Sequence, residues 1–451
     1  MTERAHRPAP AGRPGAGAPG GGGGVPAHGG GGAPADGGGA PGGGGAGAPA
    51  GGRGAPAHGG GGAPADGGGG APGGGGAGAD AVAWLGRHRA PAGVSGSLSA
   101  LDDLLVHQTL DNLGAVIAED ERWTERFIIE AHAPDDSLLL FTGLGIYPNT
   151  NYVDGFALVG SGQEQRNLRA GRELHRDGRD PFDLRAGPLR FEILVPGRRW
   201  RLAADDVGQG FAFDLVFQMR TQPYQMPTMR IVRDGALLVG YSHFVQAGRF
   251  DGWIEVDGDR RRVDGWTGER DRSWGVRPSS ARVRRGLHFW IPLQFDDVSL
   301  WLWTHEDAQG RSEGVCGAVR PVGDDPGPPV PVVGIRHELD IDKVGPHRVL
   351  RAGELDVVTA DDRRLRIEVR RDGPVLGLVG GGYGGEHAQG TPKGPDFVAF
   401  DRWSTAPESF RRVPHTILEH ACECRLDGRV GRGDVELCIG EYAPLGLGPV
   451  E

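Results

Sequence analysis

The sequence predicts an all-β protein in which two antiparallel β-barrels pack together behind a disordered tail rich in Gly, Ala and Pro. Three observations support this prediction: glycines crowd into the N-terminal region, apolar and polar residues alternate along many short segments further on, and turn residues separate those segments. Alternation with a period of two is typical of strands that bury one face. We place the tail at residues 1–97, the first barrel at 98–255 and the second at 256–451.

The tail lacks the apolar side chains that a folded domain needs. Residues 1–80 hold 36 of the 83 glycines, the first aromatic residue is Trp84, and the sequence of residues 26–39 recurs unchanged at 56–69. Ordering a backbone costs roughly 1–2 kcal/mol per residue, which such a segment cannot offset by burial. We therefore expect the tail to be disordered and to take no part in the chemistry.

The rest of the chain is a series of short alternating runs without long amphipathic helices. Asp-Gly pairs such as Asp257-Gly258 and Asp427-Gly428 separate the runs, and this dipeptide is the strongest short-range signal for a hairpin. Strands without crossover helices pair antiparallel, and a chain of this length exceeds what one core supports. The runs that carry the prediction are residues 126–132, 137–143, 189–195, 211–218, 286–295, 298–304, 364–370 and 415–425.

Composition excludes several classes of function. With 49 basic and 59 acidic residues the net charge is −10, whereas binding to a phosphate backbone needs a basic face, so nucleic acid is not an expected partner. No apolar run is long enough for a transmembrane helix, and the N-terminus lacks the order of a signal peptide. The four cysteines form neither a disulfide ladder nor a zinc spacing, which predicts a cytoplasmic protein with no structural metal.

Tryptophan is concentrated in the middle of the chain. Six of the ten tryptophans lie between Trp253 and Trp303. In the run of residues 298–304, alternation places Leu300 and Leu302 on one face and Trp301 and Trp303 on the other. Because both faces are apolar, we expect this strand to lie between two barrel interiors or between a ligand cavity and a core. A thick aromatic core without a cavity is the alternative.

The segment 263–278 places charges among these aromatic residues. Arg270, Asp271 and Arg272 stand beside Trp274, and buried charges are costly unless they are paired. An Arg partner on a neighbouring strand would keep Asp271 ionised. In an apolar cavity without such a partner, Asp271 would stay protonated. Two interpretations of the segment follow. Its charges form a salt bridge that joins two domains, or Asp271 donates a proton and Arg270 orients a ligand.

A second polar cluster lies in the glycine-rich segment of residues 381–390. Its glycines do not follow the dinucleotide-binding spacing, so a nucleotide loop is excluded. Tyr383, Glu386 and His387 are either polar groups at a barrel mouth or members of an exposed loop. Asn149 follows a Tyr-Pro pair in a turn, where it orients a ligand or simply supports the turn.

Several of these segments together resemble a known group of proteins. The chain is similar, over most of residues 100–446, to an uncharacterised two-part bacterial family related to the AttH-like and carotenoid 1,2-hydratase (hydroxyneurosporene synthase) proteins. The resemblance implies two lipocalin-like barrels of the calycin type, an architecture that some natural-product cyclases also use. The motifs that carry it are HQT at 107–109, WTERF at 123–127, GLGIYPN at 143–149, GERDRSWGVR at 268–277, HFWIPLQF at 288–295 and GGYGGEHAQG at 381–390.

The hydratase branch of this resemblance implies acid-initiated addition of water to an isoprenoid C=C bond. A protonated Asp271 would donate to the alkene, and the faces of Trp274, Trp290, Trp301 or Trp303 would stabilise the cation. A pericyclic cyclase would need an apolar pocket and one hydrogen-bond donor. Neither reaction requires a metal or a nucleotide, so no cofactor is expected.

Three hypotheses of function remain open at this point. The first is a cofactor-independent hydratase, isomerase or cyclase acting on an isoprenoid or polyketide-like molecule; the second is a non-catalytic carrier of such a molecule; the third is a scaffold with an aromatic core. The expected partner is a hydrophobic small molecule, without integral membrane association. The predicted catalytic residues are Asp271, Glu386 and His387, and the predicted ligand-binding residues are Asn149, Arg270, Trp274, Trp290, Trp301, Trp303 and Tyr383.

Overall fold

The computed structural model describes residues 98–105, 120–174, 183–233, 236–277 and 285–449, all of which belong to one compact unit. The predicted tail and the HQT motif lie outside the described residues. Within them the secondary structure is almost entirely antiparallel strands, and the one α-helix, α2 (Pro407–Phe410), is a single turn. None of the described helices is long and apolar enough to cross a membrane. The all-β prediction is therefore confirmed.

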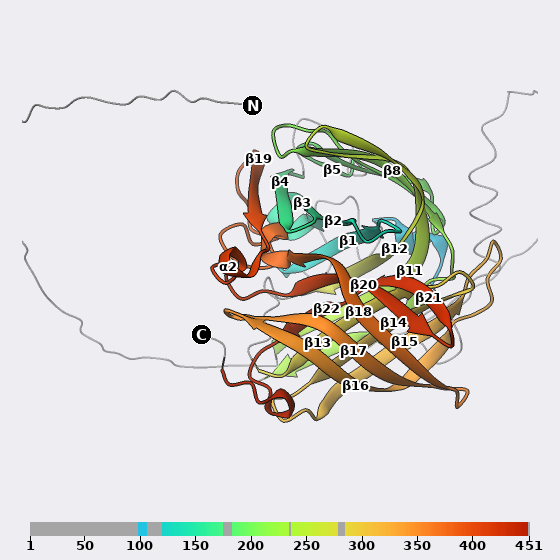
Figure 1. The fold of residues 1–451 in the computed structure, drawn as a ribbon. Helices are drawn as coiled ribbons and strands as arrows, with labels where there is room; N and C mark the ends of the chain where they lie inside the picture. The colour runs from blue at the N-terminus through green and yellow to red at the C-terminus, as the bar shows by residue number, and fades with distance from the viewer. Residues whose placement is uncertain (1–97, 106–119, 175–182, 234–235, 278–284, 450–451) are drawn as a thin grey trace, which may run out of the picture. The chain divides into compact units, whose positions relative to one another are not determined.

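The first sheet is a curled, open sheet of thirteen strands (Figure 1). Eleven of them follow the order β19-β4-β3-β2-β1-β12-β11-β8-β7-β6-β5, and β9 and β10 pair with β11. The strands are β1 (Trp123–His132), β2 (Leu138–Tyr147), β3 (Tyr152–Ser161), β4 (Glu164–Glu173), β5 (Arg185–Ala186), β6 (Leu189–Val195), β7 (Arg199–Ala204), β8 (Phe211–Met219), β9 (Tyr224–Gln225), β10 (Met229–Arg233), β11 (Ala236–Val256), β12 (Asp259–Val276) and β19 (Asp396–Ser404).

The second sheet has nine strands and closes on itself. Closure follows because β13 pairs with β14 on one side and with β21 on the other, which leaves the barrel without a free edge between them. The strands are β13 (Leu287–Gln294), β14 (Val298–Glu306), β15 (Ser312–Pro321), β16 (Val330–Val344), β17 (His347–Thr359), β18 (Arg364–Gly377), β20 (Leu418–Leu426), β21 (Arg429–Asp434) and β22 (Glu436–Ile439). The prediction of two packed barrel-like sheets is confirmed, with the first sheet open and the second closed.

The Asp-Gly hairpins form as the sequence predicts. Asp257 and Gly258 have φ values of 51° and 84°, and Asp427 and Gly428 have 50° and 78°. A two-residue turn with positive φ at both positions matches the right-handed twist of the flanking strands, and Asp followed by Gly accommodates it at low cost. These turns fix the register of β11 with β12 and of β20 with β21.

The sheets do not correspond to two consecutive halves of the chain. The predicted boundary at residues 255/256 falls in the β11–β12 hairpin, and both strands of this hairpin belong to the first sheet. The chain passes from the first sheet to the second between Val276 and Leu287, and β19 later returns to pair with β4. Whether each sheet folds as an independent domain remains a prediction.

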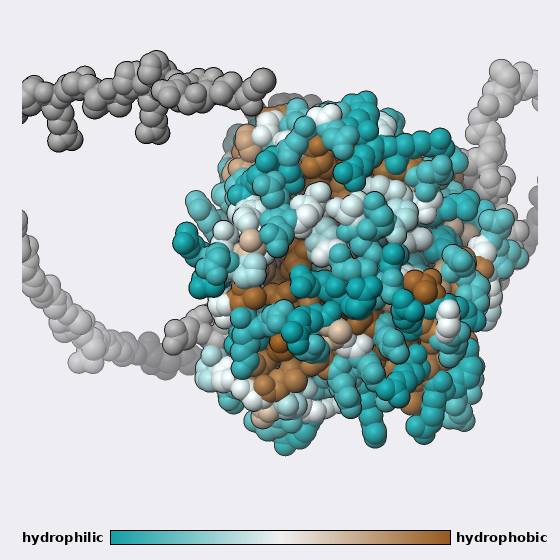
Figure 2. Space-filling view, in the orientation of Figure 1, coloured by the Kyte–Doolittle hydropathy of each residue, from teal (hydrophilic) through white to brown (hydrophobic). Residues whose placement is uncertain are grey.

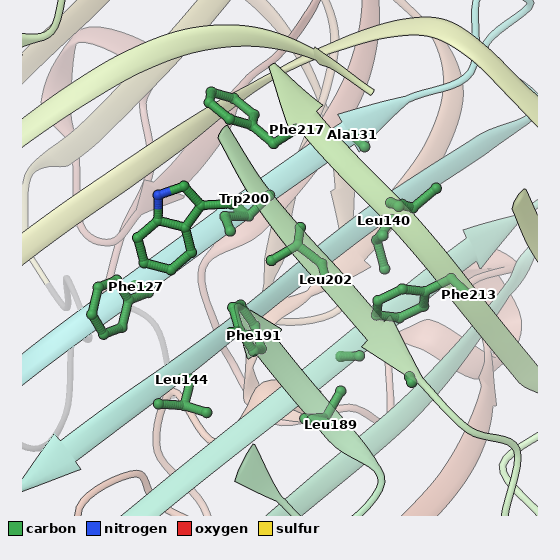
Figure 3. Packing of buried hydrophobic residues seen from close by; sticks show 14 of the residues in the cluster. Phe127, Ala131, Leu140, Leu144, Leu189, Phe191, Trp200, Leu202, Phe213 and Phe217 are labelled. Atoms are coloured by element: carbon green, nitrogen blue, oxygen red, sulfur yellow. The ribbon is translucent and has the colours of Figure 1, made fainter. Parts of the chain in front are cut away.

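Each sheet encloses its own apolar core. Phe127, Trp200, Leu202 and Phe213 converge inside the first sheet (Figure 3). Leu300 and Leu302 lie in the core of the barrel, while Trp301 on the opposite face belongs to a separate buried cluster with Val245 of β11. The alternation predicted for residues 298–304 is therefore confirmed. Figure 2 shows a largely hydrophilic face on which apolar residues form separate patches.

Candidate functional site

Outward-pointing side chains of the two sheets meet in what we call the inter-sheet layer. In β1, Phe127 and Ile129 enter the core of the first sheet, so Arg126 and Ile128 point the other way, and Ile128 packs against Leu376 of the barrel. The polar and aromatic groups that make up the candidate site are Arg126, His243, Asp271, His288, Trp290, Trp301, Trp303, His305, Tyr383 and Glu436.

Several residues of this group keep partial solvent access, although most of their neighbours on the same strands are buried. Arg126 is the one residue of β1 that is not buried, and Glu436 is the one such residue of β22. In β13 only His288 and Trp290 retain access. Asp271 keeps 17% of its side-chain surface accessible although most residues around it in β12 are buried. Four separate strands thus place their accessible residues in one layer.

Asp271 and His243 form the centre of one wall. His243 Nε2 lies 2.9 Å from Asp271 Oδ2, and the imidazole stacks on Trp290 with ring centroids 4.8 Å apart. Burial acts to raise the pKa of Asp271, but His243 and then Arg277 and Arg126 outweigh it and hold the pKa below its ordinary value. Asp271 is therefore a carboxylate near neutral pH. This favours the ionised alternative over the neutral proton donor that isoprenoid hydration would require.

The barrel supplies a second carboxylate–imidazole pair. His288 Nε2 lies 2.5 Å from Glu436 Oε1, and its Nδ1 lies 2.5 Å from His305 Nε2. His305 in turn stacks on Trp303, with centroids 4.7 Å apart. Burial and the neighbouring His288 lower the pKa of His305 to about 3, so this imidazole stays neutral and shares a hydrogen bond with His288 rather than taking its proton.

Arg126 and Tyr383 complete the accessible group. The guanidinium carbon of Arg126 lies 5.1 Å from the centre of the Tyr383 ring, and Arg126 also donates to Gln389. Burial raises the pKa of the Tyr383 phenol above its ordinary value, although Arg126 opposes this, so Tyr383 is a neutral hydrogen-bond donor. Tyr383 packs on Phe141 and Phe156 of the first sheet.

The predicted ligand residues Arg270 and Trp274 lie on the opposite face of β12. Arg270 is buried in the interior of the first sheet, where it pairs with Asp103 and donates to Gln246 Oε1 at 2.8 Å. Trp274 contacts Phe244 on the same side. Alternation along the strand separates both residues from Asp271.

Three other predicted residues also lie apart from Asp271. Asn149 Nδ2 donates to the carbonyl of Asp120 at 2.8 Å, which ties the turn before β3 to the start of β1. Glu386 is exposed, and His387 contacts Phe397 of β19. The site that the structure brings together therefore contains Asp271, Trp290, Trp301, Trp303 and Tyr383 from the predicted set.

One ion pair that joins the sheets is made by a neighbour of the predicted residues. Arg270 and Arg272 pair within the first part of the chain, with Asp103 and Glu125. Glu269 instead reaches across to Arg320 of β15, with Arg320 Nη2 donating to Glu269 Oε2 at 2.8 Å. The segment 263–278 thus does form a salt bridge between the sheets, but through Glu269 rather than through Arg270, Asp271 or Arg272.

Sequence reasoning missed Arg126, His243, His288, His305 and Glu436. One signal was present, because the alternation of residues 126–132 places Arg126 on the face opposite Phe127. The other four contact partners on different strands, and no local pattern predicts those contacts.

Two surface hollows lie away from this group. One, of about 490 Å³, is lined by residues of β16, β17 and β18, including Glu354 and Arg370. The other, of about 580 Å³, lies beside Asp136 and Phe410. Neither is lined by Trp290 or Asp271.

Comparison with known proteins assigns the chain to a family. Residues 98–448 match the model of a family of unknown function, DUF8625, and the chain belongs to this family. No curated protein matches the chain.

The solved structures that are similar to this chain include the following three. A protein assigned as AttH from Nitrosomonas europaea has 13% identity and a TM-score of 0.46, with 71% of this chain and 93% of that chain covered. CghA with Sch210972 has 11% identity and a TM-score of 0.39, covering 71% and 89%. Kievitone hydratase from Nectria haematococca has 9% identity and a TM-score of 0.37, covering 70% and 88%.

Proposed function

We propose that the inter-sheet layer binds an apolar small molecule that carries a carbonyl group and catalyses its isomerisation, cyclisation or conjugate hydration by acid–base chemistry. The observation that carries this proposal is the convergence of partly accessible polar residues, among them Arg126, Asp271 and His288, in an otherwise buried layer lined by tryptophan. Sites of this composition, mostly apolar with a few convergent polar groups, are typical of small-molecule binding.

The proton-transfer role falls to His243 and Asp271. An imidazole oriented by a carboxylate beside one nitrogen presents the other to the substrate. His243 Nε2 lies 2.9 Å from Asp271 Oδ2 as an ion-pair contact, and neither ring nitrogen of His243 makes a well-aligned hydrogen bond to the described residues. His243 removes a proton next to the carbonyl, or from a water molecule that adds to a conjugated C=C bond. Asp271 stabilises the imidazolium that forms, and the same proton returns to the product carbon.

Arg126 and Tyr383 supply the complementary stabilisation. When the proton is removed, negative charge develops on the carbonyl oxygen of the substrate. A permanent cation and a neutral phenol are donors that stabilise this charge without giving up a full proton. Trp290 and Trp303 provide apolar faces for the remainder of the substrate. Hydration of an unactivated isoprenoid alkene is less favoured, because the carboxylate of Asp271 is already ionised.

Asp271→Asn is the direct test, with Asp264→Asn as its matched control because Asp264 is an exposed residue of the same strand. Native mass spectrometry of the purified full-length protein recovers the bound molecule, and chromatography with mass detection follows its conversion. We expect Asp271→Asn to retain the molecule but to convert it at least about 100-fold more slowly, while Asp264→Asn matches the wild type.

Two results would contradict this assignment. If the wild-type protein returns its molecule unchanged, the protein is a carrier and the catalytic proposal fails. If Asp271→Asn unfolds at a much lower urea concentration than the wild type, the role of Asp271 is structural.

A further inference from the structure

A second group of buried polar residues lies at one end of the inter-sheet layer and has no role in the proposed reaction. Glu130 and His132 are two residues apart on the outward face of β1, and Asp434 is the last residue of β21. One ligand atom from each of these three side chains lies within 4.8 Å of the other two. Residues about 300 positions apart in the chain, and in different sheets, thus place their polar atoms together.

Glu130 and His132 have polar atoms without partners although they are removed from solvent. Glu130, His132 and Asp434 are 5%, 1% and 0% exposed. Glu130 Oε1 and both ring nitrogens of His132 form no hydrogen bond to the described residues. The Asp434 carboxyl lies within hydrogen-bonding reach of Glu419 and of the backbone N–H groups of His420 and Val435. A buried polar atom without a partner costs about 1–3 kcal/mol, so such a concentration indicates a missing binding partner.

The charges around this group favour a positively charged partner. Among the described residues no Arg or Lys forms an ion pair with Glu130, Glu419 or Asp434, and the one ion-pair distance in the group is 3.5 Å, from His132 Nε2 to Glu130 Oε1. Arg432 is near in sequence but pairs with Asp136, at 2.9 Å. The carboxylate oxygens and one imidazole nitrogen offer lone pairs to a cation, whereas the negative charge of the carboxylates repels an anion.

We propose that Glu130, His132 and Asp434 bind a divalent transition-metal ion of the zinc type. One imidazole and two carboxylates are ligands of the kind that Zn²⁺ accepts, with bonds of about 2.0–2.2 Å, and the imidazole disfavours Mg²⁺ and Ca²⁺, which prefer oxygen ligands. Three protein ligands leave a coordination position open beside Glu419. The ion connects β1 of the first sheet with β21 of the barrel, and this inference does not depend on the proposed function.

Zinc binding to purified, untagged, full-length protein tests the proposal. After chelator treatment and reloading with zinc sulfate, metal analysis and calorimetry give stoichiometry and affinity, and X-ray absorption at the zinc edge gives the ligands. We compare His132→Gln and Asp434→Asn with His347→Gln, a change to a buried histidine of the barrel whose Nε2 lies 3.0 Å from the Val413 carbonyl, outside this group.

We expect one tightly bound zinc ion per chain, coordinated by nitrogen and oxygen and without sulfur at about 2.3 Å. His132→Gln and Asp434→Asn should weaken zinc binding by at least about 100-fold, whereas His347→Gln should bind as the wild type does. Equal binding by all three variants would overturn the proposal, as would sulfur coordination through a cysteine or no retained zinc. In the last case the carboxyl groups share protons instead. Should both variants fail to fold, the absorption spectrum of the wild type still decides.

Discussion

The two faces of β12 use neighbouring charged residues in opposite ways. Arg270 points into the interior of the first sheet, where it is 2% exposed and paired with Asp103. Asp271 points into the inter-sheet layer, where it keeps partial solvent access beside His243. A buried and paired charge holds the fold together, whereas an accessible charge in a buried layer is available to a ligand. The difference between Arg270 and Asp271 therefore separates a structural charge from an accessible one within a single strand, and Glu269 shows that the layer face also holds a buried structural pair.

The largest expected effect is on the interior face. Arg270→Leu leaves the Asp103 carboxylate buried without its guanidinium partner, and breaking a buried pair in this way costs about 3–5 kcal/mol of the free energy of unfolding. Arg262→Leu, which removes an exposed ion pair from the same strand, should leave stability nearly unchanged. Urea denaturation measures both variants, and equal midpoints for the two would contradict the distinction between the faces.

Two tryptophans sharpen the same comparison. Trp200 is 1% exposed inside the first sheet and donates its indole N–H to Asp103 at 2.8 Å, so Trp200→Ala should cost about 3–5 kcal/mol of stability. Trp290 stacks on His243 in the layer, and Trp290→Ala should cost less stability but abolish retention of the small molecule. Denaturation and native mass spectrometry report the two effects separately. If a folded Trp200→Ala variant loses the molecule and Trp290→Ala retains it, the ligand binds inside the first sheet. That result would contradict a binding site in the inter-sheet layer.

A smaller effect concerns Asp154, which lies on the outward face of β3. Burial raises its pKa to about 6 from an unfolded value near 3.8, while the N–H of Gly390, Lys393 and Arg126 oppose the rise, as does the hydroxyl of Tyr147. Between these values the folded protein binds more protons than the unfolded chain, so stability falls as pH rises from about 4 to 6 and levels off above that range. The total fall is up to about 3 kcal/mol.

Asp154→Asn removes this pH dependence. Relative to the variant, the wild type should therefore lose stability between about pH 4 and 6, and the two unfolding profiles should run parallel at higher pH. Profiles that stay parallel across the whole range would show that the Asp154 carboxyl is not protonated in the folded state.

The sequence predicted the strands and the faces better than the partners across strands. Alternation correctly separated Leu300 from Trp301, and the Asp-Gly turns correctly located two hairpins, because both signals depend on residues close in the chain. Register is less local: a bulge between Phe250 and Gly252 shifts the pairing of β11 with β12. No pattern within one strand could show that His243 would stand beside Asp271.

The misplaced ligand residues have a related cause. Alternation shows that Arg270 and Asp271 point in opposite directions, but it does not show which direction leads to the core of a sheet and which to its neighbour. Glu436 and His288 are 148 residues apart and meet only because β22 pairs with β13. Long-range strand order, which sets these contacts, is carried by packing over the whole sheet rather than by any motif.

The most direct measurement is a crystal structure of the full-length protein with the molecule that copurifies with it. The account predicts electron density between the sheets that contacts Trp290 and Tyr383, with a carbonyl oxygen near Arg126 and the reacting carbon near His243. Density among Trp200, Leu202 and Phe213 inside the first sheet, or in either surface hollow, would contradict it.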